Sequence, residues 1–370
     1  MKTILLIGAG KSATVLINYL LKEAEINKWK FIIADADREQ ALAKTNNSRF
    51  AEVLHLDITN EKQREKIIQR AHVVISMMPP ALHFLVAKDC VEYRKHLLTA
   101  SYLDEDMKSL KDEIHQRKLF FLCEMGLDPG IDHMSAMKII EEIKEKEGNI
   151  RSFKSHCGGL VAPESDDNPW HYKISWNPRN IVLAGSTGAE YKLNDEVKKV
   201  SYEHLFDNAN TVDIDGLGKL AYYPNRDSLS YLPVYKLPQV ASFVRTTLRY
   251  PAFFLGWNAI VKAGLSNDIT EIDTTGLTFK KWSAPVLEYV NENNESLLSY
   301  LGLFEDVPVP EAATTSANIL QHLLETKLGM KPGDKDMIVM LHEFEYEFNG
   351  KQKFLQSSLI VKGEDNLQTA

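Results

Sequence analysis

The earliest residues in the chain whose types and spacing suggest chemistry are Gly8, Gly10 and Ala13, in the pattern Gly-x-Gly-x-x-Ala. An apolar run at residues 3–7 precedes them and a helical pattern follows at once, so the order is strand, glycine turn and helix. Glycines in such a turn let the main chain approach a pyrophosphate, and the helix presents its N-terminal amides to the phosphates. We therefore predict a dinucleotide site at residues 8–13, against the alternative of a purely structural turn.

Asp35 bears on the choice of cofactor. It ends a second apolar run at residues 29–34, which completes a strand–helix–strand unit. A carboxylate at that place accepts a hydrogen bond from a ribose 2′-hydroxyl and repels a 2′-phosphate. NAD is therefore favoured. NADP stays open as the alternative, because Arg38 is near enough in sequence to meet a 2′-phosphate and Asp37 is equally well explained as a helix cap.

Later loops hold polar residues that ordinary packing explains poorly. Asp128 stands beside a Pro-Gly pair after a predicted strand, where cofactor and substrate meet in open α/β sheets. Cys157 precedes paired glycines, but taken alone it is better explained as a buried structural thiol than as a catalytic one. Arg226 and Arg249 stand near hydroxyl residues and suit a substrate with several carboxylates, because guanidinium binds carboxylate through two parallel hydrogen bonds. A surface ion pair is the alternative for each arginine.

The first third of the chain predicts a scaffold for these residues. Strand patterns at residues 50–55, 72–76, 96–100 and 118–123 alternate with helical patterns that begin near residues 60, 81 and 104. Such alternation is typical of a parallel sheet with right-handed crossovers. Ligands of open sheets bind beyond the carboxyl ends of the strands, which here are residues 8–10, 35, 57, 76–80, 101–102 and 124–130.

The rest of the chain predicts a different architecture. After a predicted helix at residues 132–147 the alternation stops, with strand-like segments at 152–156, 181–184 and 218–223. Asn349-Gly350 lies between two strand patterns and indicates a hairpin. Residues 255–321 are mostly helical in pattern. We therefore predict a Rossmann-type α/β domain at residues 1–125, an α+β domain with a mixed sheet at 126–254 and 330–370, and a small helical subdomain at 255–329.

Composition narrows the class of function. The 370 residues exceed the usual size of one hydrophobic core, and the net charge of −8 without a basic cluster disfavours nucleic acid or an anionic membrane surface as a partner. Cys90, Cys123 and Cys157 are widely spaced, which fits a reducing compartment better than a disulfide framework or a zinc site. We expect a soluble cytoplasmic protein that binds a small molecule and no metal, nucleic acid or membrane.

Seven short stretches, in order, are Gly8-Ala-Gly10 with Ala13, Thr99-Ala-Ser101-Tyr102, residues 124–133, Cys157-Gly-Gly with Ala162-Pro-Glu164, and residues 172–176, 223–228 and 247–250. Together they resemble the saccharopine dehydrogenase family, specifically its glutamate-forming branch, also called saccharopine reductase. The resemblance runs nearly end to end. It implies a variant Rossmann domain, a mixed-sheet domain, a small helical domain and a homodimer.

The resemblance also implies site residues. It places the dinucleotide on Gly8, Gly10, Lys11, Ser12, Ala13, Asp35, Asp57 and Ile58, and near Ser76 and Trp176. It places saccharopine against Ser101, Tyr102, Asp128, Arg226, Thr247, Leu248 and Arg249, with Cys157 close to the reacting carbon. Fungal members have an Arg-type residue where this chain has Asp35-Ala-Asp37. This departure argues against NADP and agrees with the NAD-using animal branch. Family members are also expected to continue beyond residues 367–370.

The expected reaction is the oxidation of the secondary amine of saccharopine to an imine, which is hydrolysed to L-glutamate and 2-aminoadipate 6-semialdehyde, or the reverse, in lysine metabolism. For proton transfer we rank Asp128 first and Cys157 second, and interpret His133 as structural. The alternative within enzymes is another imine-reducing relative, such as a carboxynorspermidine or homospermidine-type synthase. The alternative of another class is a non-catalytic dinucleotide-binding sensor.

Overall fold

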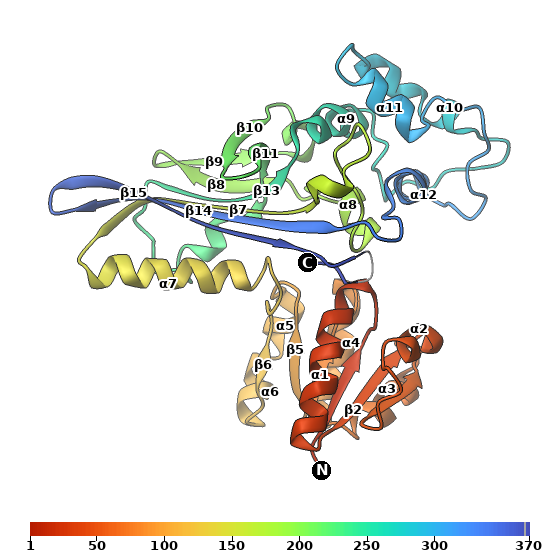
Figure 1. Cartoon of the computed structure of the whole chain (residues 1–370), viewed down its shortest axis with the longest axis vertical. Coiled ribbons are helices and arrows are strands. Elements are labelled where there is room, and N and C mark those ends of the chain that lie inside the picture. The colour runs from red at the N-terminus through yellow and green to blue at the C-terminus, as the bar shows by residue number, and fades with distance from the viewer. Residues whose placement is uncertain (366–367) are drawn as a thin grey trace. The chain divides into compact units, whose positions relative to one another are not determined.

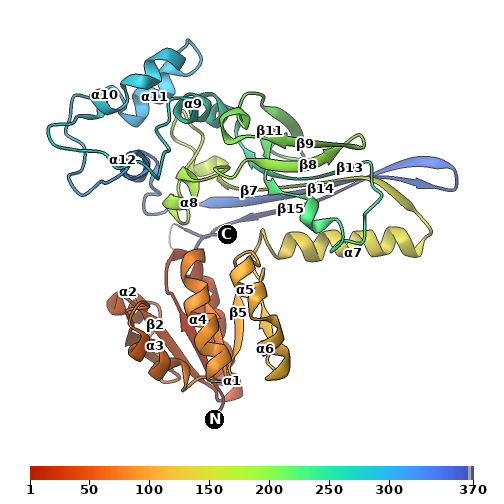
Figure 2. The same ribbon diagram turned by 180° about the vertical axis from the view of Figure 1, so that it is seen from behind.

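The computed structural model describes residues 1–365 and 368–370, so Leu367 of the terminal stretch lies outside the described residues. The chain forms two compact units, Met1–Ser135 and Ala136–Ala370. Figure 1 colours them from red to blue along the chain, and Figure 2 gives the opposite side. Each unit is described by itself.

The first unit is built on a six-stranded parallel sheet in the order β3-β2-β1-β4-β5-β6. Its strands are β1 (Thr3–Ile7), β2 (Lys30–Asp35), β3 (Ala51–His55), β4 (Val73–Ser76), β5 (His96–Thr99) and β6 (Phe121–Leu122). Its helices are η1 (Lys11–Ala13), α1 (Thr14–Asn27), α2 (Arg38–Ala43), α3 (Glu61–Ile68), α4 (Pro80–Glu92), α5 (Glu105–Ser109) and α6 (Lys111–Gln116). The strand order reverses between β1 and β4, so the ligand crevice is expected there. The Rossmann-type prediction is confirmed.

Both faces of this sheet are covered by apolar side chains. Leu5 and Ile7 belong to one buried cluster, whereas Leu6 between them belongs to another. Side chains alternate along a strand, and a parallel sheet buries both faces beneath its crossover helices. Asp37 caps α2 by accepting a hydrogen bond from the Gln40 N–H at 2.9 Å. The interpretation of Asp37 as a cap is thus confirmed.

The second unit contains a nine-stranded mixed sheet whose main path is β10-β11-β13-β7-β14-β15. Its strands are β7 (Asn149–Val161), β8 (Ala189–Leu193), β9 (Glu196–Val200), β10 (Asn210–Ile214), β11 (Gly218–Pro224), β12 (Arg226–Asp227), β13 (Ser242–Arg249), β14 (Asp336–Phe348) and β15 (Lys351–Lys362). β7 pairs parallel with β13 and antiparallel with β14. β14 and β15 form the predicted hairpin around Asn349-Gly350. From Ala136 on, α7 (Ile131–Glu145) runs along this sheet in both views.

Further helices cover the rest of this unit. They are α8 (Pro178–Val182), α9 (Pro251–Lys262), α10 (Phe279–Trp282), α11 (Glu295–Leu301) and α12 (Ser316–Leu328), with short 3-10 helices η2 (Pro163–Ser165), η3 (Tyr202–His204), η4 (Leu229–Tyr231) and η5 (Ala284–Tyr289). The fully buried Trp170 and Trp257 lie in the cluster that joins α9, α11 and α12 to the sheet. The mixed sheet with helices agrees with the predicted fold class.

The strand predicted at residues 181–184 is wrong, because this segment forms the end of α8 and the turn after it. Asn177 caps the helix by accepting a hydrogen bond from the Arg179 N–H, and Pro178 occupies its first turn. Ile181 and Val182 are buried in the large cluster. A short apolar run has the same pattern in a strand and in a buried helix, so the cap and the proline are the deciding signals.

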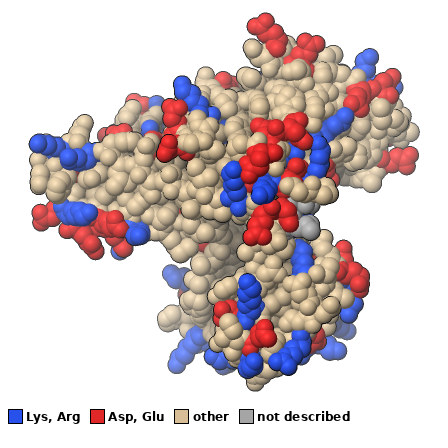
Figure 3. Space-filling view, viewed as in Figure 1, with Lys and Arg blue, Asp and Glu red and all other residues tan. Residues whose placement is uncertain are grey.

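None of the helices in the described part of the chain combines the length and apolar character that a membrane crossing requires. On the face drawn in Figure 3, basic and acidic side chains lie next to one another on both units. This mixture is consistent with the modest net charge of the chain.

Candidate active site

The glycine turn between β1 and α1 has the shape that a dinucleotide site requires. Gly8 has φ of 98°, and a Cβ there would lie 2.9 Å from the Met77 carbonyl oxygen, so only glycine fits. A Cβ at Gly10 would meet nothing within 4 Å, which leaves the turn open on that side. Lys11 and Ser12 are exposed and Ala13 is buried in η1. The residues present therefore fit a dinucleotide's phosphates.

Asp35 ties the end of β2 to this turn. Its carboxylate accepts hydrogen bonds from the N–H groups of Ala9 at 2.6 Å and Asp37 at 2.8 Å. The side chain therefore lies at the carboxyl edge, where a ribose would bind, but two of its acceptor sites are already used by the backbone. Its role toward a cofactor stays a prediction.

Lys44 is a residue of this turn that the sequence patterns did not indicate. Its ammonium donates to the carbonyl oxygens of Ala9 at 2.7 Å and Gly10 at 2.8 Å. Burial lowers its pKa, and the Asp35 carboxylate opposes that shift. No motif marks Lys44, which follows α2 and reaches the turn only because β2 lies beside β1.

Asp57 and Ile58 lie beyond the carboxyl end of β3. Asp57 is exposed, and its carboxylate accepts from the Thr59 hydroxyl at 2.7 Å and N–H at 2.9 Å, which lowers its pKa. The Ile58 side chain is buried in the core, and its carbonyl oxygen accepts a hydrogen bond from Arg64 at 2.8 Å. The Ile58 side chain is therefore not accessible to a ligand and its carbonyl oxygen is already bonded, whereas Asp57 presents an exposed carboxylate.

Ser76 and Ser101 are brought together by His83, which the sequence patterns also did not indicate. The imidazole Nδ1 lies 2.9 Å from the Ser76 hydroxyl at the end of β4. Its Nε2 lies 2.8 Å from the Ser101 hydroxyl, two residues beyond β5. Both His83, which lies on α4 and is 4% exposed, and Ser76 are buried. One imidazole therefore joins a predicted cofactor residue to a predicted substrate residue.

Tyr102 and Asp128 form the second polar pair at this edge of the sheet. The Tyr102 hydroxyl donates to the Asp128 carboxylate at 2.9 Å. Asp128 lies in a tight loop that is closed by hydrogen bonds from Gly126 N–H to the Pro129 carbonyl and from Ile131 N–H to the Gly126 carbonyl. The loop and the tyrosine together hold the carboxylate in place, as proton transfer requires.

His133 and Asp132 support this loop. The His133 ring lies 3.3 Å from the Glu124 carboxylate, and that carboxylate also accepts from the Leu103 N–H at 3.0 Å. Asp132 is buried in the first turn of α7, and its carboxylate accepts from the Gly130 N–H at 2.7 Å. Both side chains are bound into the structure around Asp128, which agrees with a structural interpretation of His133.

In the second unit, β7 and β13 bring Cys157 and Thr247 opposite each other in parallel register. Cys157 is buried. A Cβ at the neighbouring Gly158 would lie 2.6 Å from the Leu248 carbonyl oxygen, so this glycine is required by the close approach of β13 rather than by a ligand. Gly159 is not crowded in this way, since its Cβ would meet only a side-chain atom at 3.8 Å.

Arg249 is not a surface residue, because it is only 5% exposed. Its guanidinium packs over the rings of Tyr172 at 5.2 Å and Phe253 at 5.4 Å, and donates to the Leu248 carbonyl at 2.8 Å. The alternative of a surface ion pair is therefore wrong for this arginine. The Leu248 side chain belongs to a buried apolar cluster with Leu220, and strand alternation directs it to the face opposite that of Thr247 and Arg249.

Arg226 and Trp176 are exposed. Arg226 has φ of 50° and lies in β12, which pairs with β8 at Ala189. The neighbouring Asp227 carboxylate accepts from the Leu229 N–H at 2.7 Å and so begins η4. Trp176 keeps 42% of its surface accessible. Both side chains are accessible to a ligand, and their roles stay predictions.

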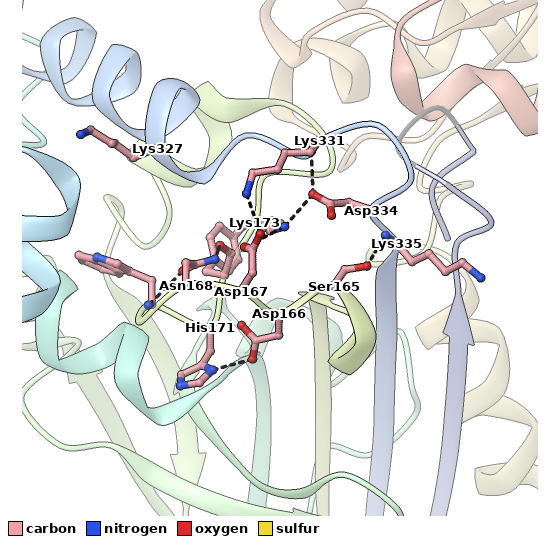
Figure 4. A network of polar contacts seen from close by, with 12 residues as sticks. Ser165, Asp166, Asp167, Asn168, His171, Lys173, Lys327, Lys331, Asp334 and Lys335 are labelled. Carbon is pink, nitrogen blue, oxygen red and sulfur yellow. Dashed lines mark hydrogen bonds and ion pairs between the residues drawn. The ribbon is translucent and has the colours of Figure 1, made fainter.

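An ion-pair network holds the segment that leads to Trp176 (Figure 4). Lys173 is only 4% exposed, and its ammonium lies 2.9 Å from the Asp167 carboxylate and 2.7 Å from the Asp334 carboxylate. Lys331 binds Asp167 from the other side at 2.7 Å. Hydrogen bonds from these two lysines lower the pKa of Asp167 to about 2. The network fixes residues 166–173 to the turn before β14.

Comparison with known proteins identifies the family. The family model of the saccharopine dehydrogenase C-terminal domain matches residues 126–370, and that of the saccharopine dehydrogenase NADP binding domain matches residues 4–121. Saccharopine dehydrogenase [NADP(+), L-glutamate-forming] of Saccharomyces cerevisiae is 32% identical over 98% of this chain and 86% of its own length. The structure of the apo histidine-tagged yeast enzyme matches with a TM-score of 0.85 and 29% identity, over 98% of this chain and 86% of that one.

Longer proteins match as well. Mitochondrial alpha-aminoadipic semialdehyde synthase of Bos taurus is 30% identical over 99% of this chain but only 42% of its own length. Alpha-aminoadipic semialdehyde synthase of Arabidopsis thaliana is 33% identical over 80% of this chain and 31% of its own length. The chain thus spans less than half of these two relatives. The matches extend over nearly all of the sequence, and the chain belongs to the saccharopine dehydrogenase family.

Proposed function

We propose that the protein is an NAD(P)-dependent saccharopine dehydrogenase of the L-glutamate-forming type. Saccharopine, NAD(P)⁺ and water would give L-glutamate, 2-aminoadipate 6-semialdehyde, NAD(P)H and a proton, or the reverse, as a step of lysine metabolism. The observation that carries the proposal is the Tyr102–Asp128 hydrogen bond at the carboxyl edge of a sheet whose glycine turn fits a dinucleotide. The yeast relative, which matches over nearly the whole chain, bears the name of this activity.

Asp128 is the proposed acid–base group. A bound nicotinamide supplies the redox chemistry by accepting hydride from the carbon next to the amine. Asp128 takes the amine proton and releases it to solvent, and as a carboxylate again it accepts a proton from the water that adds to the imine carbon. Tyr102 orients the carboxylate through its hydroxyl, and the closed loop at residues 126–131 keeps that carboxylate at the strand ends. Cys157 ranks second, because a thiol beside paired glycines can orient the substrate amine or relay a proton. It is buried on β7 opposite Thr247.

Arg226 and Arg249 are the proposed groups for the substrate's carboxylates, together with Thr247. Arg249 is buried among aromatic rings, where its charge is poorly hydrated and an anionic ligand is favoured. Arg226 is exposed, and we assign to it a second carboxylate of the substrate. For Leu248 we propose no direct side-chain contact, since that side chain is in the core.

For the cofactor we propose NAD, with NADP as the alternative. Asp35 lies at the end of β2 and disfavours a 2′-phosphate. Arg38, the nearby cation in the sequence, is paired with Glu39 at 3.0 Å on the surface. NADP stands in the names of the yeast relative and of the matching domain, so both nucleotides belong in the test.

The test is a turnover assay with saccharopine and either NAD or NADP in parallel, with L-glutamate measured as a product. Turnover of carboxynorspermidine but not of saccharopine would support the alternative enzyme. Nucleotide binding without turnover of any of these amines would support the sensor. From the resemblance we also propose a homodimer, which sedimentation analysis would test. From the three widely spaced cysteines we propose a cytoplasmic location, which cell fractionation would test.

A further inference from the structure

A chain of three side chains, of which Ser76 and His83 are buried and Ser101 is half-buried, links the end of β4 to the loop after β5 at the carboxyl edge of the first sheet. Ser76, His83 and Ser101 are joined by contacts of 2.9 Å and 2.8 Å, one on each ring nitrogen. We call these three residues the serine–histidine relay. Its two ends are the residues for which the family resemblance predicts contact with the cofactor and with the substrate.

The relay is not needed to hold the sheet together. β4 and β5 are already paired along their length, and the last pair in register is Ser76 with Thr99. His83 reaches past this pair and binds Ser101 in the loop beyond. Two other histidines of the unit, His72 and His96, accept hydrogen bonds from backbone N–H groups of Thr3 and Phe120. His83 differs from these two because the partners of both its ring nitrogens are side-chain hydroxyls.

The chemistry of the ring sets the direction of each hydroxyl. A neutral imidazole has one N–H donor and one acceptor nitrogen, so one serine must accept from the ring while the other donates to it. The serine that accepts keeps its own proton for a ligand. Burial lowers the pKa of His83 and so favours the neutral ring, and the Asp104 carboxylate at the start of α5 opposes this shift.

Ser101 is directly followed by Tyr102, whose hydroxyl holds Asp128. Displacement of Ser101 therefore moves the backbone that carries the tyrosine. From these contacts we propose that His83 is a positioning residue for the oxidation of saccharopine, which sets the Ser101–Tyr102 loop for Asp128 and orients Ser76 toward the cofactor. This inference rests on the proposed function.

The experiment compares His83→Ala, His83→Gln, Ser101→Ala and the double variant His83→Ala/Ser101→Ala. We expect His83→Ala to lower kcat about tenfold, as for one lost buried hydrogen bond, and the double variant to be no slower than His83→Ala. In His83→Gln the side-chain amide supplies an N–H donor and a carbonyl acceptor in place of the two ring nitrogens, so kcat should recover to within about threefold of the wild type. His96→Ala, at the amino end of β5, is the matched control and should leave kcat unchanged.

A merely structural role would have a different signature. In that case His83→Ala would lower the melting temperature without changing kcat in the folded protein, and His83→Gln would not restore activity. Losses in His83→Ala and Ser101→Ala that multiply in the double variant would also overturn the proposal. Melting temperatures of all variants are measured beside kcat, so that loss of folded protein is corrected for.

A second readout separates this inference from the proposed function. NADH affinity, measured by fluorescence quenching, should weaken by the same few-fold factor in His83→Ala, Ser76→Ala and their double variant. If the wild type does not turn over saccharopine, the proposed function fails, and with it the role of His83 in that reaction. If NADH affinity then weakened equally in His83→Ala, Ser76→Ala and the double variant, the relay would still position the cofactor. If NADH affinity were unchanged in His83→Ala and in Ser76→Ala, that role would be removed as well.

Discussion

Two polar networks in this protein are built from different groups. At the carboxyl edge of the first sheet, the His83 imidazole binds the hydroxyls of Ser76 and Ser101, and the Tyr102 hydroxyl donates to Asp128. In the second unit, Lys173 is surrounded by the carboxylates of Asp167 and Asp334. Hydroxyls and a neutral ring can turn their donors toward a ligand, whereas a buried ammonium must keep its counter-ions.

The network at the carboxyl edge of the first sheet can present hydrogen-bonding groups to a ligand, whereas the network around Lys173 holds a segment of the chain in place. The carboxyl edge of the sheet has the side chains to which we assign proton transfer and ligand binding in the proposed reaction, so changes there should alter kinetics. The ion pairs in Figure 4 fix residues 166–173 to the turn before β14, with Ser165 accepting from the Lys335 N–H at 2.9 Å. Changes there should alter stability. The following predictions test this distinction.

The largest effect is expected at Asp128. Asp128→Asn removes the proton acceptor but keeps an oxygen for the Tyr102 hydroxyl, so kcat should fall by about 10²–10⁴-fold with folding intact. Cys157→Ser should lower kcat less and His133→Asn least. Measuring kcat against pH for the three variants checks this order. A fully active Asp128→Asn beside an inactive His133→Asn would reverse the ranking.

Lys173 should be the clearest stability residue. Lys173→Met leaves the Asp334 carboxylate, which is 14% exposed, without its cation, and should lower the free energy of unfolding by about 2–3 kcal/mol. Lys331→Met removes a lysine that is 68% exposed and should cost less than about 1 kcal/mol. Urea unfolding measures both, with kcat as the control. Loss of kcat at unchanged stability in Lys173→Met would contradict the distinction.

Arg249 tests whether a buried cation of the second unit is kinetic rather than structural. Arg249→Lys keeps the charge but loses the two parallel donors, so KM for saccharopine should rise roughly tenfold or more, from a charged hydrogen bond worth about 1.5–3 kcal/mol. NAD affinity should stay nearly unchanged. Arg226→Lys should behave alike, and a wild-type KM in both variants would exclude them from substrate binding.

The effect of Asp35 on the choice between NAD and NADP should be smaller than the effects described above. Asp35→Ala removes a carboxylate that repels a 2′-phosphate, but also two hydrogen bonds to the turn, so the preference for NAD over NADP should narrow by about tenfold while both affinities fall. The ratio of kcat/KM for the two nucleotides measures this. A wild-type enzyme with markedly better kcat/KM for NADP would refute the assignment.

The smallest effect concerns acid stability. The pKa of Asp167 is about 2 in the folded protein against an ordinary 3.8, so its stabilising contribution is complete above about pH 3.8 and is lost as pH falls toward 2. Asp167→Asn should therefore reduce the stability difference between pH 5 and pH 3. Urea unfolding at both values tests this, and the size is modest because the side chain is 44% exposed.

Local patterns in the sequence determined the glycine turn, the alternating strands and helices of residues 1–125, and the hairpin at Asn349-Gly350. Each depends on contacts between residues near in the chain, such as the positive φ of Gly8 or the cap at Asp37. The family, too, could be identified from seven short stretches of sequence. These features carry their signal in residue type and spacing.

Tertiary structure alone decided which side chains meet. His83 follows Ser76 by seven residues but precedes Ser101 by eighteen, and Lys44 lies more than thirty residues after the turn that it binds. Strand register placed Leu248 in the core while its neighbour Arg249 packs on aromatic rings of the other face. Such contacts arise when crossovers and strand pairing bring distant segments together, and periodicity in one segment contains no information on its distant neighbours.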